Sequence, residues 1–292
     1  MTDTEIRSEI ARAFDEARTQ NPLAPSITNT VTQDFVANAQ LAVGGAAAMM
    51  YLPDECEDIA KLAPAFYVNM GTAMPFYAET LPRAAKACHD LQKPWVLDPV
   101  GIGMSELRTK ILLQLKDFKP SIVRGNASEI IALANLWSLI NTPGGQVRGV
   151  ESTEKVSAAK VAAVTLAKFT GGVVAVSGEE DLITDSKEIV MCTGGSEFFT
   201  KITGSGCALG GVMAVYAAVA SPLIAALTAT TVFNLAGSKA VADSKGPASF
   251  KVHFLDNLYN LTATEVSEKF RAVESLFESM FNFGVVAFPH AD

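Results

Sequence analysis

The chain carries the stretch Thr200-Lys201-Ile202-Thr203-Gly204-Ser205-Gly206-Cys207 directly ahead of a small-residue, apolar segment, residues 208–220. Gly204 and Gly206 permit backbone conformations that are closed to other residues, and the segment after them is typical of a helix that begins at Cys207 or just before it. The unpaired N–H groups and the positive helix dipole predict an anion site that would hold a phosphate. The alternative is a glycine-rich turn that lets the helix pack closely on a sheet, with Cys207 as an ordinary core residue.

Cys207 is also a candidate reactive group. The first turn of a helix favours a thiolate, so we expect the pKa of this thiol to be lowered from its usual value of ~8.5. The three histidines, at 89, 253 and 290, show no metal-ligand spacing. None is an evident catalytic partner for Cys207, which argues against a cysteine hydrolase.

The composition indicates a stably folded, acidic protein. A chain of 292 residues with 49% hydrophobic content suffices for one large α/β domain or two small ones. No linker or repeat interrupts it, so we expect a single domain over residues 1–292, with 1–20 as an N-terminal surface helix. The net charge of -8 argues against nucleic acid or an anionic membrane as a partner. An anionic nucleotide must then be held by local backbone donors and a metal ion.

The cysteines indicate the redox state of the compartment, and one uncharged run raises the question of a membrane segment. The cysteines at 56, 88, 192 and 207 form neither a CxxC pair nor a disulfide framework, so we expect free thiols in a reducing cytoplasm. No residue between Lys201 and Lys239 is charged, which resembles a membrane span. Pro222 divides this run and Ser and Thr recur in it, so we expect two buried helices and no membrane segment.

Buried strands alternate with helical patterns along the chain. Short apolar runs, each followed by a small or polar cluster, predict strands buried on both faces at 66–68, 95–97, 122–123 and 173–176. Apolar residues at helical spacing predict helices over 81–91 and 107–118. The alternation predicts an α/β fold with a mostly parallel sheet flanked by helices, and ligands at the carboxyl ends of the strands.

The flanking segments are predicted from local patterns. Residues 21–25 are expected to form a loop, 33–41 a helix, and 182–184 with 189–192 a hairpin. Gly44-Gly45 is expected to turn into an apolar stretch whose methionines, Met49 and Met50, would line a substrate pocket or belong to the core. The chain is expected to end in an amphipathic helix with one apolar face: Val266, Phe270, Val273, Phe277 and Met280.

Two carboxylates and an arginine follow the predicted strands. Asp98 precedes Pro99, so its side chain is expected to point into the crevice, although Asp also suits a turn. Asn126 and Glu129 have the spacing of a helix-capping pair. Glu129 would also face Asp98, and the two carboxylates would then hold a Mg²⁺ that bridges nucleotide phosphates. Arg124 suits phosphate binding, the alternative being a salt bridge at the sheet edge.

A set of motifs, taken in chain order, resembles one enzyme family. The chain lacks a GxxxxGKS phosphate loop and an early strand-linked GxGxxG. The motifs present are Ile27-Thr28-Asn29, Ala37-Asn38, Leu41-Ala42-Val43-Gly44, Leu97-Asp98-Pro99-Val100-Gly101, Arg124-Gly125-Asn126-Ala127-Ser128-Glu129, Ser177-Gly178-Glu179, the 200–207 stretch and Gly246-Pro247-Ala248-Ser249-Phe250. Over residues 23–262 the sequence resembles hydroxyethylthiazole kinase, a thiamine-salvage enzyme of the ribokinase-like superfamily.

The resemblance implies an activity and an assembly. It implies a ribokinase-like fold and transfer of the γ-phosphoryl group of ATP to the primary hydroxyl of 4-methyl-5-(2-hydroxyethyl)thiazole, with Mg²⁺, for thiamine diphosphate biosynthesis. It also implies a homotrimer with thiazole pockets at the subunit interfaces.

The same resemblance implies roles for single residues. Cys207 would stand, with Gly204 and Gly206, at the catalytic centre, where most ribokinase-like enzymes carry an aspartate base. The implied partners of the ligands are Met49, Gly204 and Asn29 for the thiazole alcohol, Arg124, Ser177 and Asn126 for ATP, and Asp98 and Glu129 for the metal.

The sequence departs from the family pattern at five positions. Ser177 and Ser205 replace threonines and keep the hydroxyl, and Ala248 replaces a glycine. Pro25 stands where His is common and Ala47 replaces a frequent Pro; Pro25 is nearer the implied thiazole pocket.

Two other functions are compatible with the same residues. One is a different ribokinase-like activity, a pyrimidine-alcohol kinase or an ATP-dependent dehydratase, although these usually carry Asp in place of Cys207. The other is a catalytically silent nucleotide-binding homologue, which would be expected to lack the metal carboxylates.

Overall fold

The computed structural model describes residues 1–141 and 152–270, and within these ranges eight strands form one sheet. Their order is β2-β1-β3-β4-β5-β6-β7-β8. β1 to β6 are parallel to their neighbours in this group, whereas β7 and β8 pair antiparallel. The strands are β1 (Leu23–Ile27), β2 (Ala46–Met49), β3 (Phe66–Asn69), β4 (Trp95–Asp98), β5 (Ile122–Asn126), β6 (Val173–Ser177), β7 (Asp181–Thr184) and β8 (Ile189–Cys192).

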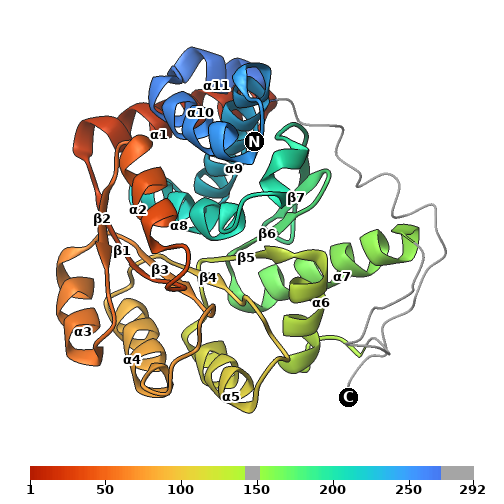
Figure 1. Ribbon diagram of the computed structural model, residues 1–292. Coiled ribbons are helices and arrows are strands. Elements are labelled where there is room, and N and C mark those ends of the chain that lie inside the picture. Colours follow the sequence, from red (N-terminus) through yellow and green to blue (C-terminus); the bar gives the residue numbers. More distant parts are fainter. Residues whose placement is uncertain (142–151, 271–292) are drawn as a thin grey trace.

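Helices cover both faces of this sheet (Figure 1). One face carries α1 (Asp3–Gln20), α2 (Gln33–Ala42), α8 (Ser205–Ala217), α9 (Pro222–Asp243), α10 (Pro247–Asn260) and α11 (Ala263–Lys269). The other carries α3 (Pro53–Leu62), α4 (Tyr77–Asp90), α5 (Glu106–Leu115), α6 (Ala127–Leu136) and α7 (Ser152–Thr170). Two short 3-10 helices are η1 (Lys116–Phe118) and η2 (Glu197–Thr200). The predicted α/β fold with a mostly parallel sheet is confirmed.

Side chains along the central strands alternate between the two cores. In β3, Phe66 and Val68 belong to the core under α3 to α7, and Tyr67 belongs to the core under α8. Since successive side chains of a strand point to opposite faces, Asn69 leaves the sheet on the same side as Tyr67. The same alternation places Asp98 of β4 and Arg124 of β5 on that side. The polar residues at these strand ends therefore share the face that α8 covers.

The prediction of a loop over residues 21–25 is wrong, because β1 begins at Leu23 and includes Pro25. Proline lacks the N–H that a central strand normally donates. The Ser26 carbonyl accepts a hydrogen bond from Met50, on the β2 side, so the alternation points the Pro25 nitrogen toward β3. Pairing with β3 starts only at Ser26. Pro25 therefore leaves no ladder hydrogen bond unmade.

Strand β2 was not predicted as a strand. Its sequence is Ala46-Ala47-Ala48-Met49, and alanine has low strand propensity. Its position is fixed by parallel pairing with β1, in which Ser26 lies opposite Met49. The preceding turn forms as predicted, with Gly44 at a φ of 101°.

The helices at the two ends of the chain differ in how much of them is described. α1 buries Ile6, Ile10 and Phe14, as the N-terminal pattern predicted. At the other end α11 buries Val266 and ends at Lys269. Val273, Phe277 and Met280 of the predicted amphipathic helix lie outside the described residues.

The uncharged run forms α8 and α9, which pack in the core. Among the described residues, α9 alone is long and apolar enough to cross a membrane, and 78% of its apolar window is buried inside the fold. Almost all of α8 is buried as well. The predicted pair of buried helices is therefore confirmed.

We expect Gly210→Ala to lower the melting temperature. A Cβ at this position of α8 would lie 2.5 Å from Cε2 of Tyr67, and overpacking costs about 1–3 kcal/mol, more than the ~1 kcal/mol that alanine gains in helix propensity. Thermal denaturation followed by circular dichroism measures the change. The control is Gly246→Ala, because a Cβ there meets no atom within 4 Å and the φ of 175° is extended. An equal or higher melting temperature for Gly210→Ala would show that α8 does not need this close contact.

Candidate active site

The carboxyl ends of four neighbouring strands carry the polar side chains of the site. Asn69 lies opposite Asp98 across β3 and β4, and Asn126 lies opposite Ser177 across β5 and β6. Arg124 joins the two pairs: its Nη1 donates to Asp98 Oδ2 at 3.2 Å and its Nη2 donates to Ser177 Oγ at 3.1 Å. The polar cluster expected at this edge of the sheet is therefore present.

Helix α8 places its N-terminus over these strand ends. It begins at Ser205, as predicted, after Gly204 with a left-handed φ of 88°. No side chain caps this end, and the first N–H groups of a helix have no acceptor within it. A Cβ on Gly206 would lie 2.5 Å from Arg124 Nη1, so any other residue there would displace the guanidinium from its present position. Free amides, the helix dipole and an arginine together suit an anion.

Asp98 is fully buried and its two carboxylate oxygens differ. Oδ2 accepts hydrogen bonds from Tyr67, Asn69 and Arg124 at 3.0 to 3.2 Å, whereas Oδ1 has no partner among the described residues. Burial raises the pKa of Asp98 to about 6; Arg124 opposes this shift and the charge of Glu129 adds to it. A buried carboxylate oxygen without a donor is a suitable ligand for Mg²⁺. Arg124 forms an ion pair with Asp98 and also lines the cavity described below, so phosphate binding by Arg124 stays a prediction.

The expectation that the pKa of Cys207 is lowered is wrong. Its side chain is nearly buried, and burial together with the charge of Asp98 raises the pKa of the thiol. The sequence argument relied on the helix dipole and included neither this burial nor the charge of Asp98. Sγ accepts hydrogen bonds from Asn69 Nδ2 at 3.4 Å and from Asn29 Nδ2 at 3.7 Å. At neutral pH the group is therefore a thiol held by two amides.

Asn126 and Glu129 form the predicted capping pair. The Asn126 N–H donates to Glu129 Oε2 and the Glu129 N–H donates to Asn126 Oδ1, both at 2.9 Å. Ser128 Oγ also donates to Asn126 Oδ1, at 2.7 Å. This cap fixes the start of α6 and holds Glu129 near Asp98, whose pKa its charge affects.

Asn29 and Met49 lie at the same edge of the sheet but at different distances from the cluster. Asn29 follows β1 and contacts Cys207 through its amide, while its Oδ1 accepts the Val31 N–H at 3.0 Å. Met49 ends β2, with β1 between its strand and β3. The structure therefore joins Asn29 to Cys207, whereas Met49 lies two strands away from β3.

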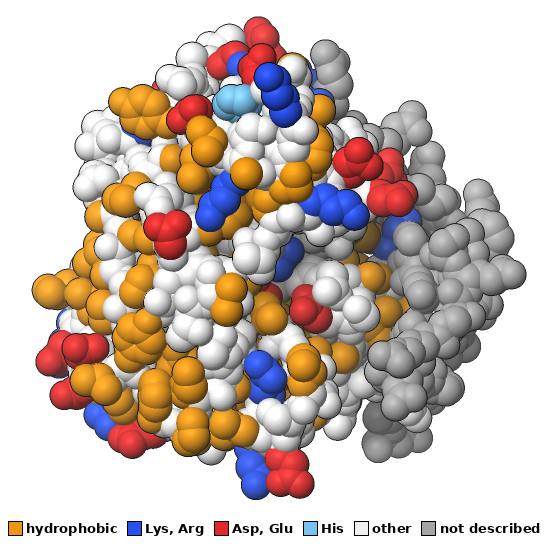
Figure 2. All heavy atoms as spheres, viewed as in Figure 1, with side chains coloured by type: hydrophobic (Ala, Val, Ile, Leu, Met, Phe, Trp, Pro, Cys, Tyr) orange, Lys and Arg blue, Asp and Glu red, His pale blue; other side chains and the backbone are white. Residues whose placement is uncertain are grey.

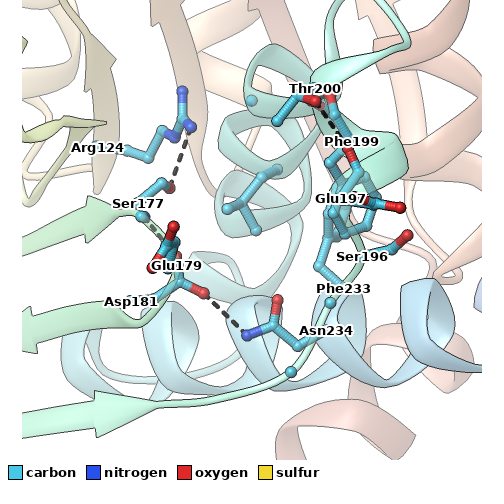
Figure 3. Close-up of a pocket in the computed structure, with 16 residues that line it drawn as sticks. Arg124, Ser177, Glu179, Asp181, Ser196, Glu197, Phe199, Thr200, Phe233 and Asn234 are labelled. Atoms are coloured by element: carbon cyan, nitrogen blue, oxygen red, sulfur yellow. Dashed lines mark hydrogen bonds between the residues drawn. The ribbon is translucent and has the colours of Figure 1, made fainter.

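A cavity of about 520 Å³ opens beside this cluster (Figure 3). Its walls come from the β6–β7 turn, the loop at 194–200, the start of α8 and one turn of α9. Arg124 and Ser177 meet at one end, and Asp181 accepts a hydrogen bond from Asn234 at 2.9 Å at the other (Figure 3). The rings of Phe199 and Phe233 form the facing wall. The cavity thus has a cationic end and an apolar, aromatic side.

The residues of the site that were not predicted include Tyr67, Asn69, Asp181 and Asn234 and the aromatic wall of Phe199 and Phe233. Asn69 follows a buried strand as Asp98 does, so its position was a usable signal, but asparagine after a strand is also an ordinary turn former. Tyr67 lies inside an apolar run and Asn234 inside an apolar helix, where sequence gives no indication of a polar partner.

Comparison with known proteins agrees with this geometry. The Hydroxyethylthiazole kinase family matches residues 14–264. A hydroxyethylthiazole kinase of Bifidobacterium longum is 48% identical over 285 residues, covering 91% of each chain. The solved structure of a hydroxyethylthiazole kinase protein from Pyrococcus horikoshii has a TM-score of 0.80 and 30% identity, covering 91% of this chain and 99% of that one. A ribokinase-like superfamily protein from Enterococcus faecalis shares the fold, with a TM-score of 0.62 at 12% identity and coverage of 90% and 94%. The chain therefore belongs to the hydroxyethylthiazole kinase family.

Proposed function

We propose that this protein transfers the γ-phosphoryl group of ATP to the primary hydroxyl of 4-methyl-5-(2-hydroxyethyl)thiazole, giving the thiazole phosphate used in thiamine diphosphate biosynthesis. Membership of the family supports the activity. The observation that carries the proposal is the position of the uncapped N-terminus of α8. Ser205 and Gly206 line the cavity, and Cys207, the next residue, faces Asn29 and Asn69. The same free amides thus lie between a nucleotide-sized cavity and a separate cluster of polar side chains.

ATP would occupy the cavity with its phosphates toward Arg124 and the start of α8. A volume of about 520 Å³ is within the usual range for small-molecule sites. Arg124 and Ser177 supply hydrogen-bond donors at the phosphate end, and Asn126 lies beside Ser177 in the sheet. The aromatic wall of Phe199 and Phe233 suits the base.

Asp98 and Glu129 would hold Mg²⁺ at the phosphates. The bare Oδ1 of Asp98 and the nearby carboxylate of Glu129 fit a cation that takes one or two carboxylates together with phosphate oxygens and water. When bound, the cation would neutralise charge that develops on the transferred group. Arg124 and the amides of residues 204–207 would contribute to the same charge stabilisation.

The alcohol would approach from the side of Asn29, Met49 and Gly204. Because the pKa of Cys207 is raised, the thiol would orient the hydroxyl and not act as a preformed thiolate base. Most of the rate would then come from in-line positioning and charge neutralisation. Pro25 and Ala47 belong to the β1–β2 pair, and Pro25 lies opposite Ala48, next to Met49. Of the departures from the family pattern, Pro25 and Ala47 therefore lie on the side of the acceptor, whereas Ser177 and Ser205 line the cavity proposed for ATP.

We further propose a cytoplasmic homotrimer with active sites at the subunit interfaces. β2, which carries Met49, is an edge strand of the described sheet. Figure 2 shows hydrophobic side chains over the region where α3 and α4 lie in Figure 1, and Leu52 and Leu62 near β2 are 51% and 76% exposed. A partner subunit would cover these side chains. The four free thiols agree with a reducing compartment.

The proposed reaction predicts ATP consumption that depends on the thiazole alcohol. Mass spectrometry should show a product heavier than the alcohol by one phosphate, and none with a pyrimidine alcohol. Phosphorylation of the pyrimidine alcohol alone would identify a different ribokinase-like activity. Absence of ATP consumption with either alcohol would identify a silent nucleotide-binding protein.

Cys207→Ala is expected to reduce kcat and leave the Kd of ATP nearly unchanged. Because the group acts as a thiol, we expect a loss smaller than the ~100-fold typical of removing a general base. Steady-state kinetics and ATP titration measure the two quantities. Cys88→Ala is the matched control, since this buried thiol of α4 lies in the other core. If turnover in Cys207→Ala were unchanged, Cys207 would contribute only to packing.

Asp98→Asn and Glu129→Gln are expected to raise the Mg²⁺ concentration for half-maximal activity. Each keeps the shape of the side chain and removes a carboxylate, and glutamine still suits the capping position of α6. Titration of Mg²⁺ at saturating ATP measures the shift, with the exposed Glu106→Gln as control. An unshifted titration in both variants would contradict the metal assignment.

A further inference from the structure

Asn69 is the most heavily hydrogen-bonded side chain of the polar cluster and has no role in the proposed chemistry so far. It ends β3 opposite Asp98 and is fully buried. Its Nδ2 lies 2.9 Å from Tyr67 Oη, 3.0 Å from Asp98 Oδ2 and 3.4 Å from Cys207 Sγ. One side chain thus contacts β3, β4 and α8 at once.

The orientation of this amide is fixed by the backbone. Its Oδ1 accepts the Gly71 N–H at 2.8 Å, so the NH₂ group must face Tyr67, Asp98 and Cys207. An amide nitrogen carries two hydrogens, and here three acceptors surround it. Tyr67 Oη accepts from Asn69 and donates its own proton to Asp98 Oδ2 at 3.1 Å. Two hydrogens therefore serve three acceptors: Tyr67 Oη, Asp98 Oδ2 and Cys207 Sγ.

We propose that Asn69 is a positioning residue that sets the placement of Cys207 relative to Asp98 beneath the N-terminus of α8. The inference rests on the proposed function, in which both groups surround the transferred phosphoryl. Asn69 touches neither ATP nor the alcohol in that arrangement and acts through Cys207 and Asp98. By binding Oδ2 together with Tyr67 and Arg124, it also leaves Oδ1 as the oxygen available to a ligand.

Tyr67 provides a graded comparison within the same network. Its ring lies against Gly210 of α8, and its hydroxyl contacts Asn69 and Asp98. Tyr67→Phe would remove one donor from Asp98 and keep the contact between Asn69 and Cys207. Its effect on turnover should therefore be smaller than that of shortening Asn69.

The test measures how much Asn69→Ser lowers kcat in two backgrounds, the wild type and Cys207→Ala. Serine is too short to bridge Asp98 and Cys207, and misplacement of a reacting group costs up to ~100-fold, so we expect kcat to fall about tenfold or more with little change in the KM of ATP. In a Cys207→Ala background the same substitution should cost much less, because one of its targets is gone. An equal loss in both backgrounds, or no loss in either, would overturn the proposal.

A control variant and a replacement variant separate a positioning role of Asn69 from an effect on folding. The control Thr184→Val removes a buried hydroxyl that donates to the Glu188 carbonyl in the hairpin, so it should lower the melting temperature without lowering kcat. If Asn69→Ser does not fold, Asn69→Leu keeps the approximate size of the side chain, removes the donor and enters the same cycle.

A second readout does not depend on turnover. Iodoacetamide labelling with peptide mass analysis should show Cys207 reacting faster relative to Cys88 in Asn69→Ser. A parallel rise at both cysteines would indicate general loosening and contradict the proposal. A wild type without thiazole kinase activity would instead refute the proposed function, so the two failures are distinguishable.

Discussion

The close approach of α8 to the sheet is the constraint on which the site depends. Tyr67 lies where a Cβ on Gly210 would be, and the Arg124 guanidinium lies where one on Gly206 would be. An ordinary side chain at Gly210 would push α8 away from the buried Tyr67 ring of β3, and one at Gly206 would displace the Arg124 guanidinium. The glycine-rich stretch thus packs closely on the sheet, and this packing brings the helix end, where we propose the phosphate site, to the strand ends.

This packing brings a helix N-terminus and a buried guanidinium to the same cavity. An uncapped helix N-terminus and a buried guanidinium face the cavity, and Arg124 is balanced mainly by Asp98 Oδ2. Burying an ion pair costs several kcal/mol of desolvation, which the pairing only partly offsets. An anion at the helix end would supply the missing hydrogen-bond acceptors. The arrangement therefore suits the phosphate that we propose to bind at this helix end.

The sequence predicted those parts of the fold that depend on local pattern. β3 to β6 were found because strands buried on both faces are continuous apolar runs, and Asp98 and Arg124 follow such runs. β1 and β2 were missed because Pro25 and a run of alanines argue against strands locally, whereas their neighbours in space decide the pairing. The prediction of a lowered pKa for Cys207 was wrong for the same reason. The helix dipole is visible in the sequence, but burial and the charge of Asp98 arise only when remote segments meet.

The high hydropathy of α8 and α9 results from the position of the candidate site at the N-terminus of α8. A helix whose N-terminus ends over the middle of a sheet must be covered on all sides, here by the strands, α2 and α9. Charged side chains on such a helix would be buried without partners, so none occurs between Lys201 and Lys239. The polar groups in this run that serve the site, Cys207 and Asn234, have partners at the strand ends or in the cavity wall. A segment that resembles a membrane span by composition is therefore the expected result of bringing a helix dipole to the centre of a globular fold.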